Sequence, residues 1–194
     1  LLEHGGAAPM LVDQGADIEE ATRALIKGAF YHAGQVCVSV QRVFAHRRIK
    51  TELLDCLMEK TRLLRVGDPL DDTTDVGPLI RAREIERINA WAEEADREGA
   101  EIVCGGRALG NQCYSPTIII DPPATTRVMS EEVFGPVLSV VSAKSLEDAV
   151  AQGFAENLGH IEGTPEYDES VNMIKSIVPN QDLTRTGWRE KDLV

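Results

Sequence analysis

The sequence predicts an α/β domain with a mainly parallel sheet flanked by helices. Segments with the two-residue period or continuous apolar character of a strand alternate with segments that have the 3.6-residue period of an amphipathic helix. This alternation is typical of parallel sheets, because two parallel strands are joined by a crossover that is usually a helix. The chain has 194 residues, of which 43% are hydrophobic, and this is enough for one domain with a sizeable core.

The predicted strands are short apolar or alternating stretches bounded by turn residues. They span residues 8–12, 39–48, 101–106, 114–121 and 135–143. The predicted helices span residues 16–34, 49–64, 81–98 and 145–154, and the Gly-, Pro- and Asp-rich segment 66–80 is predicted to be a loop. Asp17 is the expected N-cap of the first helix, and Ser145 followed by Asp148 resembles a capping box at the start of the last.

The charge and the cysteine spacing exclude several classes of protein. The formal net charge is −12, and an acidic surface repels the phosphate backbone, so we expect no nucleic-acid partner. No apolar run approaches the roughly 20 residues that a membrane helix needs, so we expect no membrane partner. The four cysteines form no C-x-x-C pair and match no zinc or disulfide framework. We therefore expect no metal site, and a reducing, cytoplasmic location.

Three short segments contain residue types that could perform chemistry. They are LLEHGGAAP at residues 1–9, GQVC at 34–37 and SEEVFGPV at 130–137. A cysteine such as Cys37 becomes a nucleophile only with a lowered pKa or a nearby base, and release of an acyl group needs a second group that activates water. Glu3 could be that base, since the glycines that follow it allow a tight turn and a close approach to another segment.

In their order and spacing, these segments resemble the catalytic domain of the NAD(P)-dependent aldehyde dehydrogenase superfamily, over roughly residues 1–153. The resemblance implies that Cys37 is the nucleophile, with its backbone N–H in the oxyanion hole, and that Glu3 is the general base for deacylation. It also implies that Glu132 binds the ribose hydroxyls of the cofactor and that Phe134 packs near the nicotinamide ring. The expected cofactor is NAD or NADP, and the expected substrate is a small aldehyde, oxidised to a free carboxylic acid through a thiohemiacetal and a thioester.

The resemblance also predicts the extent of the domain. Residues 1–154 are expected to form the aldehyde dehydrogenase-like catalytic domain, whereas residues 155–194 match nothing clearly and are expected to be a divergent tail. The family's N-terminal dinucleotide-binding half has no counterpart in the chain, which begins at Leu1 inside a strand-like segment. We therefore expect a fragment that is inactive alone, derived from a longer, homo-oligomeric parent.

Two other functions are compatible with the same residues. The chain could be a non-catalytic remnant that folds or associates without turnover, as the missing half suggests. It could also be a cysteine hydrolase that pairs Cys37 with His4 or His32, because a thiolate often pairs with an imidazole.

Most of the candidate site residues also have a purely structural interpretation. A large apolar residue such as Phe134, between two strands, is often part of the core. Glu131 and Glu132 could be a helix-end or solvated pair. Cys56, on an apolar helix stripe, and Cys104, in a short strand, are expected to be packing residues.

Overall fold

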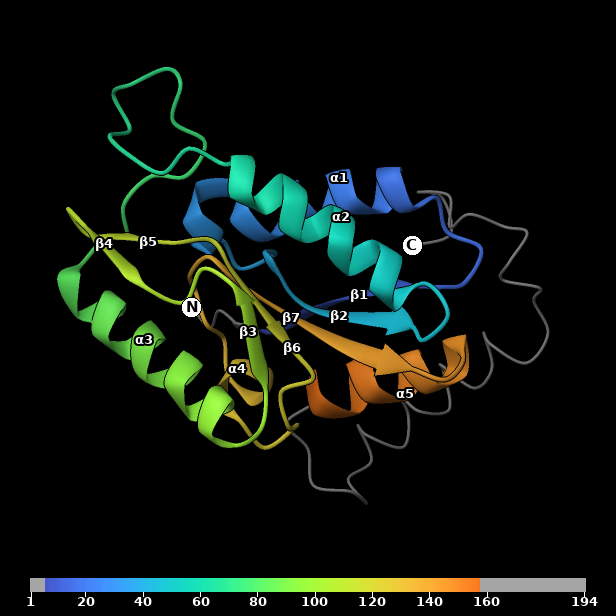
Figure 1. The fold of residues 1–194 in the computed structure, drawn as a ribbon. Helices are drawn as coiled ribbons and strands as arrows, with labels where there is room; N and C mark the ends of the chain where they lie inside the picture. Colours follow the sequence, from blue (N-terminus) through green and yellow to red (C-terminus); the bar gives the residue numbers. More distant parts are fainter. Residues whose placement is uncertain (1–5, 158–194) are drawn as a thin grey trace, which may run out of the picture.

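The protein is described by a computed structural model over residues 6–157 (Figure 1). A five-stranded sheet in the order β1-β2-β7-β6-β3 forms its centre, and its first four strands are parallel to one another. The edge strand β3 is antiparallel to β6. The strands span Ala8–Val12 (β1), Val40–His46 (β2), Glu101–Cys104 (β3), Thr117–Ile120 (β6) and Val137–Ala143 (β7). The prediction of an α/β fold with a mainly parallel sheet is confirmed.

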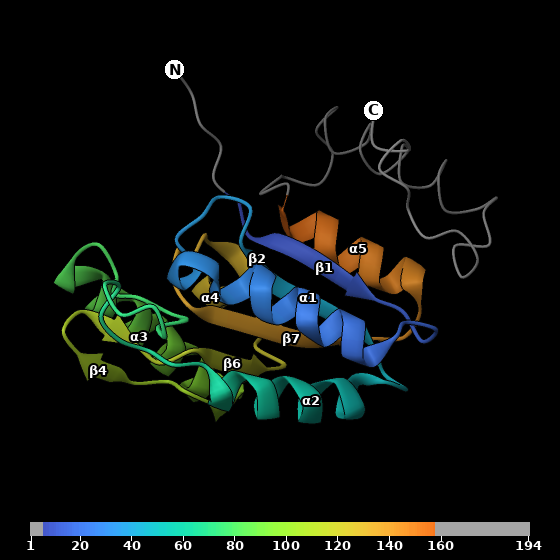
Figure 2. The same cartoon turned by 90° about the horizontal axis from the view of Figure 1, so that it is seen from above.

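Helices cover both faces of the sheet. The two helices α1 and α2 lie on one face, and α5 lies on the other with α3 and α4 (Figures 1 and 2). Their bounds are Ile18–Phe30 (α1), Lys50–Leu63 (α2), Ala82–Arg97 (α3), Arg127–Ser130 (α4) and Leu146–Asn157 (α5). A sheet covered on both faces has central strands that are buried on both sides, and β2 and β7 are buried over most of their length.

The elements predicted from the sequence are present, with ends that differ by a few residues. The largest difference is in the helix predicted over residues 16–34, because α1 ends at Phe30 and the 3₁₀ turn η1 (Tyr31–Gly34) follows it. The short helix α4 and a two-stranded hairpin, β4 (Ala108–Gly110) with β5 (Cys113–Tyr114), were not predicted.

The helix caps agree with their predictions. The Asp17 carboxylate accepts a hydrogen bond from the backbone N–H of Glu20 at 2.9 Å. At the start of α5, the backbone N–H of Asp148 donates to Ser145 Oγ at 3.2 Å. In a capping box the Asp148 carboxylate would accept from the backbone N–H of Ser145, but here it accepts from the backbone N–H of Lys144. Each bond satisfies a backbone N–H that has no partner within the helix.

The predicted domain boundary after residue 154 falls inside α5, which continues to Asn157. The rest of the predicted tail lies outside the described residues. No helix among the described residues is long and apolar enough to cross a membrane.

The polar residues of β2 are buried, although the alternation of apolar and polar residues in its sequence suggests that the polar ones face solvent. Arg42 is fully buried, and its guanidinium donates from Nε to the Ala7 carbonyl at 2.9 Å and from Nη2 to the Gly153 carbonyl at 3.0 Å. These bonds join the start of β1 to α5. A buried charged donor is tolerated where such hydrogen bonds replace those it made with water. Arg42 therefore fixes the point at which the N-terminal segment enters the sheet.

Candidate active site

Three sequence motifs meet at one edge of the sheet. The segment before β1 contains Gly6, the segment before β2 contains Cys37, and the segment before β7 contains Glu132 and Phe134. Since β1, β2 and β7 are parallel neighbours, the segments that enter them lie at the same edge. Strand order, which no local pattern gives, thus brings together residues that are far apart in the sequence.

The GQVC and EEVFGPV segments cross in backbone contact. Gly34 has a φ of +69°, and a Cβ at this position would lie 2.1 Å from the carbonyl oxygen of Gly135. No side chain fits at that distance, so Gly34 allows a close approach that any other residue would prevent. The crossing places the turn containing Cys37 beside the segment containing Glu132.

A left-handed turn leads the chain from α1 to Cys37. His32 and Ala33 have φ values of 50° and 56°, and with Gly34 they form three consecutive left-handed residues. Left-handed conformations cost roughly 1–2 kcal/mol for each non-glycine residue, and such strain is found most often at functional sites. The Ser39 N–H then donates to the Val36 carbonyl at 2.9 Å, which closes a turn with Cys37 exposed at its tip.

Hydrogen bonds from neighbouring side chains hold the Cys37 turn. Ser39 Oγ lies 3.1 Å from the Gly28 carbonyl oxygen and 3.3 Å from that of Ala29, at the end of α1. Gln35 fixes the loop on the other side, where Nε2 donates to the Pro78 carbonyl at 3.3 Å and Oε1 accepts from the Ile80 N–H at 2.9 Å. Among the described residues, neither the Cys37 thiol nor its backbone N–H has a hydrogen-bond partner.

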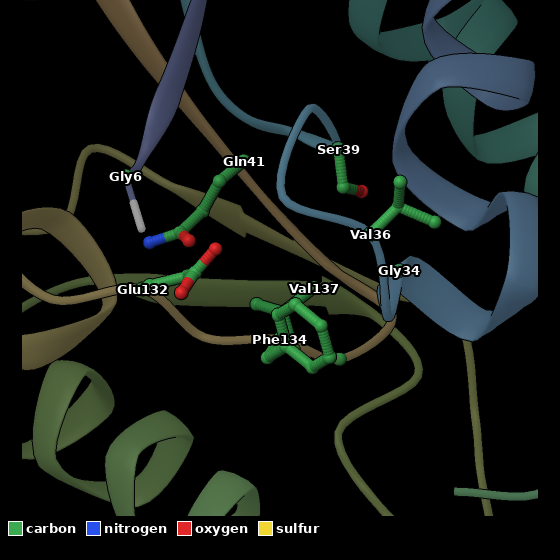
Figure 3. Close-up of a pocket in the computed structure, with 9 residues that line it drawn as sticks. Gly6, Gly34, Val36, Ser39, Gln41, Glu132, Phe134 and Val137 are labelled. Atoms are coloured by element: carbon green, nitrogen blue, oxygen red, sulfur yellow. The ribbon is translucent and has the colours of Figure 1, made fainter. Parts of the chain in front are cut away.

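Glu132 and Phe134 face a small pocket (Figure 3). The pocket has about 210 Å³ of space not filled by atoms, part of it open to solvent. Its lining comprises Gly6, Gly34, Val36, Ser39, Gln41, Glu132, Phe134, Gly135 and Val137. Cys37 does not line the pocket itself, but it lies between two residues that do, Val36 and Ser39. The predicted nucleophile is thus next in the sequence to a residue that lines the pocket, and the two predicted cofactor residues line the same pocket.

Glu132 is more buried than a surface carboxylate, and Phe134 is more exposed than a core aromatic residue. Glu132 Oε1 is shielded from solvent and has no hydrogen-bond partner among the described residues. A buried carboxylate oxygen without a donor is costly, and it calls for a ligand or water to complete it. Phe134 is 41% exposed and has a φ of 48°. It is therefore not a core residue, so the alternative of core packing is wrong.

The other predicted site residues have different outcomes. Glu3 and His4 lie outside the described residues. The His32 ring is exposed and lies against Tyr31, with 3.8 Å between the ring centroids. No hydrogen bond joins His32 to Cys37. The structure therefore gives no support to a Cys37–His32 dyad.

The chain matches the Aldehyde dehydrogenase family over residues 1–161. It belongs to the aldehyde dehydrogenase family. A 3-sulfolactaldehyde dehydrogenase from Priestia aryabhattai is 39% identical over 151 residues, which are 78% of this chain and 31% of that protein. A betaine aldehyde dehydrogenase from Cereibacter sphaeroides is 39% identical over 160 residues, which are 81% of this chain and 33% of that protein. The chain thus spans about a third of the length of these relatives.

Solved aldehyde dehydrogenases contain the same fold. A betaine aldehyde dehydrogenase from Staphylococcus aureus, solved in complex with NAD⁺, superposes with a TM-score of 0.75 at 29% identity. The match covers 78% of this chain and 31% of that one. Aldehyde dehydrogenase 21 from Physcomitrella patens, in complex with the reaction product succinate, gives a TM-score of 0.73 at 32% identity and covers 76% of this chain and 31% of that one. The family predicted from the sequence motifs is confirmed.

Several residues that build the site were not predicted from the sequence. Gln35 stands inside the GQVC motif, but its role as the anchor of residues 78–80 depends on a loop distant in sequence. Gln41 reads as an ordinary polar residue of an alternating strand. Arg87 reads as a surface residue of an amphipathic helix, yet its guanidinium donates to the Val133 carbonyl at 2.5 Å. Only the tertiary contacts reveal these three residues.

Iodoacetamide is expected to modify Cys37 before the other three cysteines of the folded chain. Burial raises the pKa of the thiols of Cys104 and Cys113, so that both remain protonated and slow to react at pH 8. Cys56 is half-buried in α2, whereas Cys37 is exposed. Mass spectrometry of peptides from a time course measures the four rates. In urea the four should react alike, and a folded chain in which Cys56 reacts as fast as Cys37 would contradict this assignment.

Proposed function

We propose that residues 1–154 form the catalytic domain of an NAD(P)-dependent aldehyde dehydrogenase that converts an aldehyde to a free carboxylic acid. The observation that carries this proposal is the juxtaposition at the Gly34–Gly135 crossing. The exposed thiol of Cys37 lies there beside a pocket lined by Glu132, and among the described residues neither the Cys37 backbone N–H nor Glu132 Oε1 has a hydrogen-bond partner. Family membership supports the same activity.

In this proposal, the Cys37 thiolate attacks the aldehyde carbon and forms a C–S bond. The carbonyl oxygen takes the negative charge of the resulting thiohemiacetal, and the backbone N–H of Cys37 donates a hydrogen bond to it. Loss of the carbon-bound hydrogen as hydride leaves a thioester on Cys37. A water molecule deprotonated by Glu3 then attacks the thioester carbon, which releases the carboxylic acid and restores the thiol.

The residues around the pocket fit a nicotinamide cofactor. Glu132 Oε1, which has no donor among the described residues, would accept from the ribose hydroxyls, and the half-exposed ring of Phe134 would offer an apolar surface to the nicotinamide. When bound, NAD or NADP supplies the hydride acceptor for this reaction. Both residues are held in the segment before β7 without any contribution from a cofactor.

The position of Gly6 supports the role proposed for Glu3. Gly6 lines the pocket, and Glu3 precedes it by three residues. Glu3 is the acidic residue nearest to Gly6 in the sequence.

The length of the chain limits what it does alone. It spans about a third of the length of its curated relatives. In the proposed enzyme, the part of those relatives that this chain does not match supplies most of the cofactor site and a second oxyanion donor. Loss of one such donor costs about 10²–10³-fold in rate. We propose that the isolated 194 residues are inactive and that the active form is a longer, homo-oligomeric protein.

The aldehydes named for the relatives, betaine aldehyde and 3-sulfolactaldehyde, are candidate substrates.

The short length also favours a second candidate, a remnant that folds or associates without turnover. An assay of the natural gene product separates the two. With NAD⁺ or NADP⁺ and either candidate aldehyde, a dehydrogenase forms reduced cofactor and carboxylic acid in equal amounts. Absence of reduced cofactor with either aldehyde would favour the remnant, and ester cleavage without cofactor would instead favour the cysteine hydrolase.

A further inference from the structure

Gln41 is a buried amide whose hydrogen-bonding groups all contact the segment before β7. It is the second residue of β2, is 5% exposed, and lines the pocket beside Glu132 (Figure 3). Its Nε2 donates to the Val128 carbonyl at 2.9 Å and to the Glu131 carbonyl at 2.7 Å. Its Oε1 accepts from the backbone N–H of Val133 at 2.8 Å. The two amide hydrogens and the amide oxygen are therefore all used.

Two of these bonds are made to the backbone groups on either side of Glu132. One holds the carbonyl of Glu131, immediately before it, and the other holds the N–H of Val133, immediately after it. The two peptide groups that flank a residue determine the direction of its Cα–Cβ bond. Gln41 thus helps to fix the direction in which the Glu132 side chain leaves the backbone.

Backbone hydrogen bonds support the segment near its ends, where the Glu131 N–H donates to the Arg127 carbonyl at 3.0 Å and the Thr117 N–H donates to the Pro136 carbonyl at 2.9 Å. Residues 131–136 belong to no helix or strand, and Phe134 has the left-handed φ of 48° that few residues adopt. Among the described residues, the side chains that hydrogen-bond to the segment are Gln41 and Arg87, and Arg87 donates to the Val133 carbonyl from the side of α3. A loop held by side chains keeps its geometry only while those side chains are present.

We infer that Gln41 is a positioning residue for the cofactor carboxylate Glu132, an inference that rests on the proposed function. The Gln41 amide holds the backbone on both sides of Glu132, whose Oε1 is shielded from solvent and has no donor among the described residues; in the proposed enzyme the ribose hydroxyls would supply one. Without the amide, the segment is free to turn the carboxylate to solvent, and cofactor binding then has to restore its position. The cost appears in cofactor affinity.

Gln41→Met in the natural gene product tests this inference, because methionine has nearly the same shape but cannot form the three hydrogen bonds. The dissociation constant for NAD⁺, measured by calorimetry without aldehyde, is expected to rise about ten-fold, as loss of one or two buried hydrogen bonds would produce. The KM for NAD⁺ should rise similarly, while kcat at saturating cofactor changes less than about three-fold. In the absence of cofactor, hydrogen exchange at the Val133 amide should become faster.

Leu57→Ala is the matched control. Leu57 is fully buried in α2, and its side chain has no hydrogen-bonding group, so its removal affects packing alone. This variant should lower the melting temperature but leave the NAD⁺ dissociation constant and the Val133 exchange rate unchanged. If Gln41→Met fails to fold, Gln41→Asn, whose amide is one methylene short of its partners, should show the same loss of affinity.

The outcomes distinguish the inference from the function on which it rests. If the wild-type protein binds NAD⁺ and the Gln41 variants bind it equally well, Gln41 is only structural and the inference is overturned, while the proposed function stands. If the wild-type protein does not bind either nicotinamide cofactor, the proposed function and the inference fail together.

Discussion

Replacing Gly34 with alanine is expected to destabilise the protein by about 3 kcal/mol and to separate the two halves of the candidate site. The left-handed φ of +69° alone costs roughly 1–2 kcal/mol for a residue with a Cβ. The new Cβ would also lie 2.1 Å from the Gly135 carbonyl oxygen and 3.1 Å from that of Ala29. Both neighbours are backbone atoms, which cannot rotate away, so the segments themselves have to move. Urea denaturation measures the change in the free energy of unfolding.

Two other glycines provide the controls for Gly34→Ala. Gly15→Ala adds a Cβ with no atom within 4 Å and no left-handed φ, and should change stability by less than about 0.5 kcal/mol. Gly135→Ala places its Cβ 2.2 Å from the tip of the Ile88 side chain, which can move, so its effect should be intermediate. A Gly34→Ala protein as stable as Gly15→Ala would show that the close crossing of the two motifs is not required.

The second large effect is expected for Cys37→Ser in the natural gene product. Serine retains the size and exposure of Cys37, but its hydroxyl is a far weaker nucleophile without an adjacent base, so kcat should fall on the order of 10⁴-fold or more. The dissociation constant for NAD⁺ should be unchanged, because the cofactor residues are on another segment. Cys56→Ser, at a half-buried position in α2, should retain most of the activity. A Cys37→Ser enzyme with a tenth or more of the wild-type kcat would contradict the role of Cys37.

Much of the fold could be predicted from the sequence because its signals are local. Strand-like and helix-like periods alternate along the chain, and each reports on the burial of one short segment. The helix that was predicted too long shows the limit of this reasoning. His32 and Ala33 continue an apparently helical sequence, but both adopt left-handed conformations, which their residue types do not predict.

The site could be predicted only in part, because its parts come together through strand order. A resemblance to a family suggested Cys37, Glu132 and Phe134; in the structure Glu132 and Phe134 line one pocket, and Cys37 follows the lining residue Val36 in the sequence. The buried polar residues of β2 could not be predicted in the same way. Gln41 looks like a solvent-facing residue of an alternating strand until the position of the segment before β7 is known.

The most direct test of the central claim is to trap the acyl group on Cys37. The natural gene product is mixed with NAD⁺ and a candidate aldehyde, quenched in acid within milliseconds to seconds, digested, and analysed by mass spectrometry. We predict an acyl adduct on the peptide containing Cys37 that forms only when cofactor is present and is removed by hydroxylamine, as a thioester is. Formation of carboxylic acid with Cys37 unmodified at every time, or with the acyl group on another residue, would contradict the account.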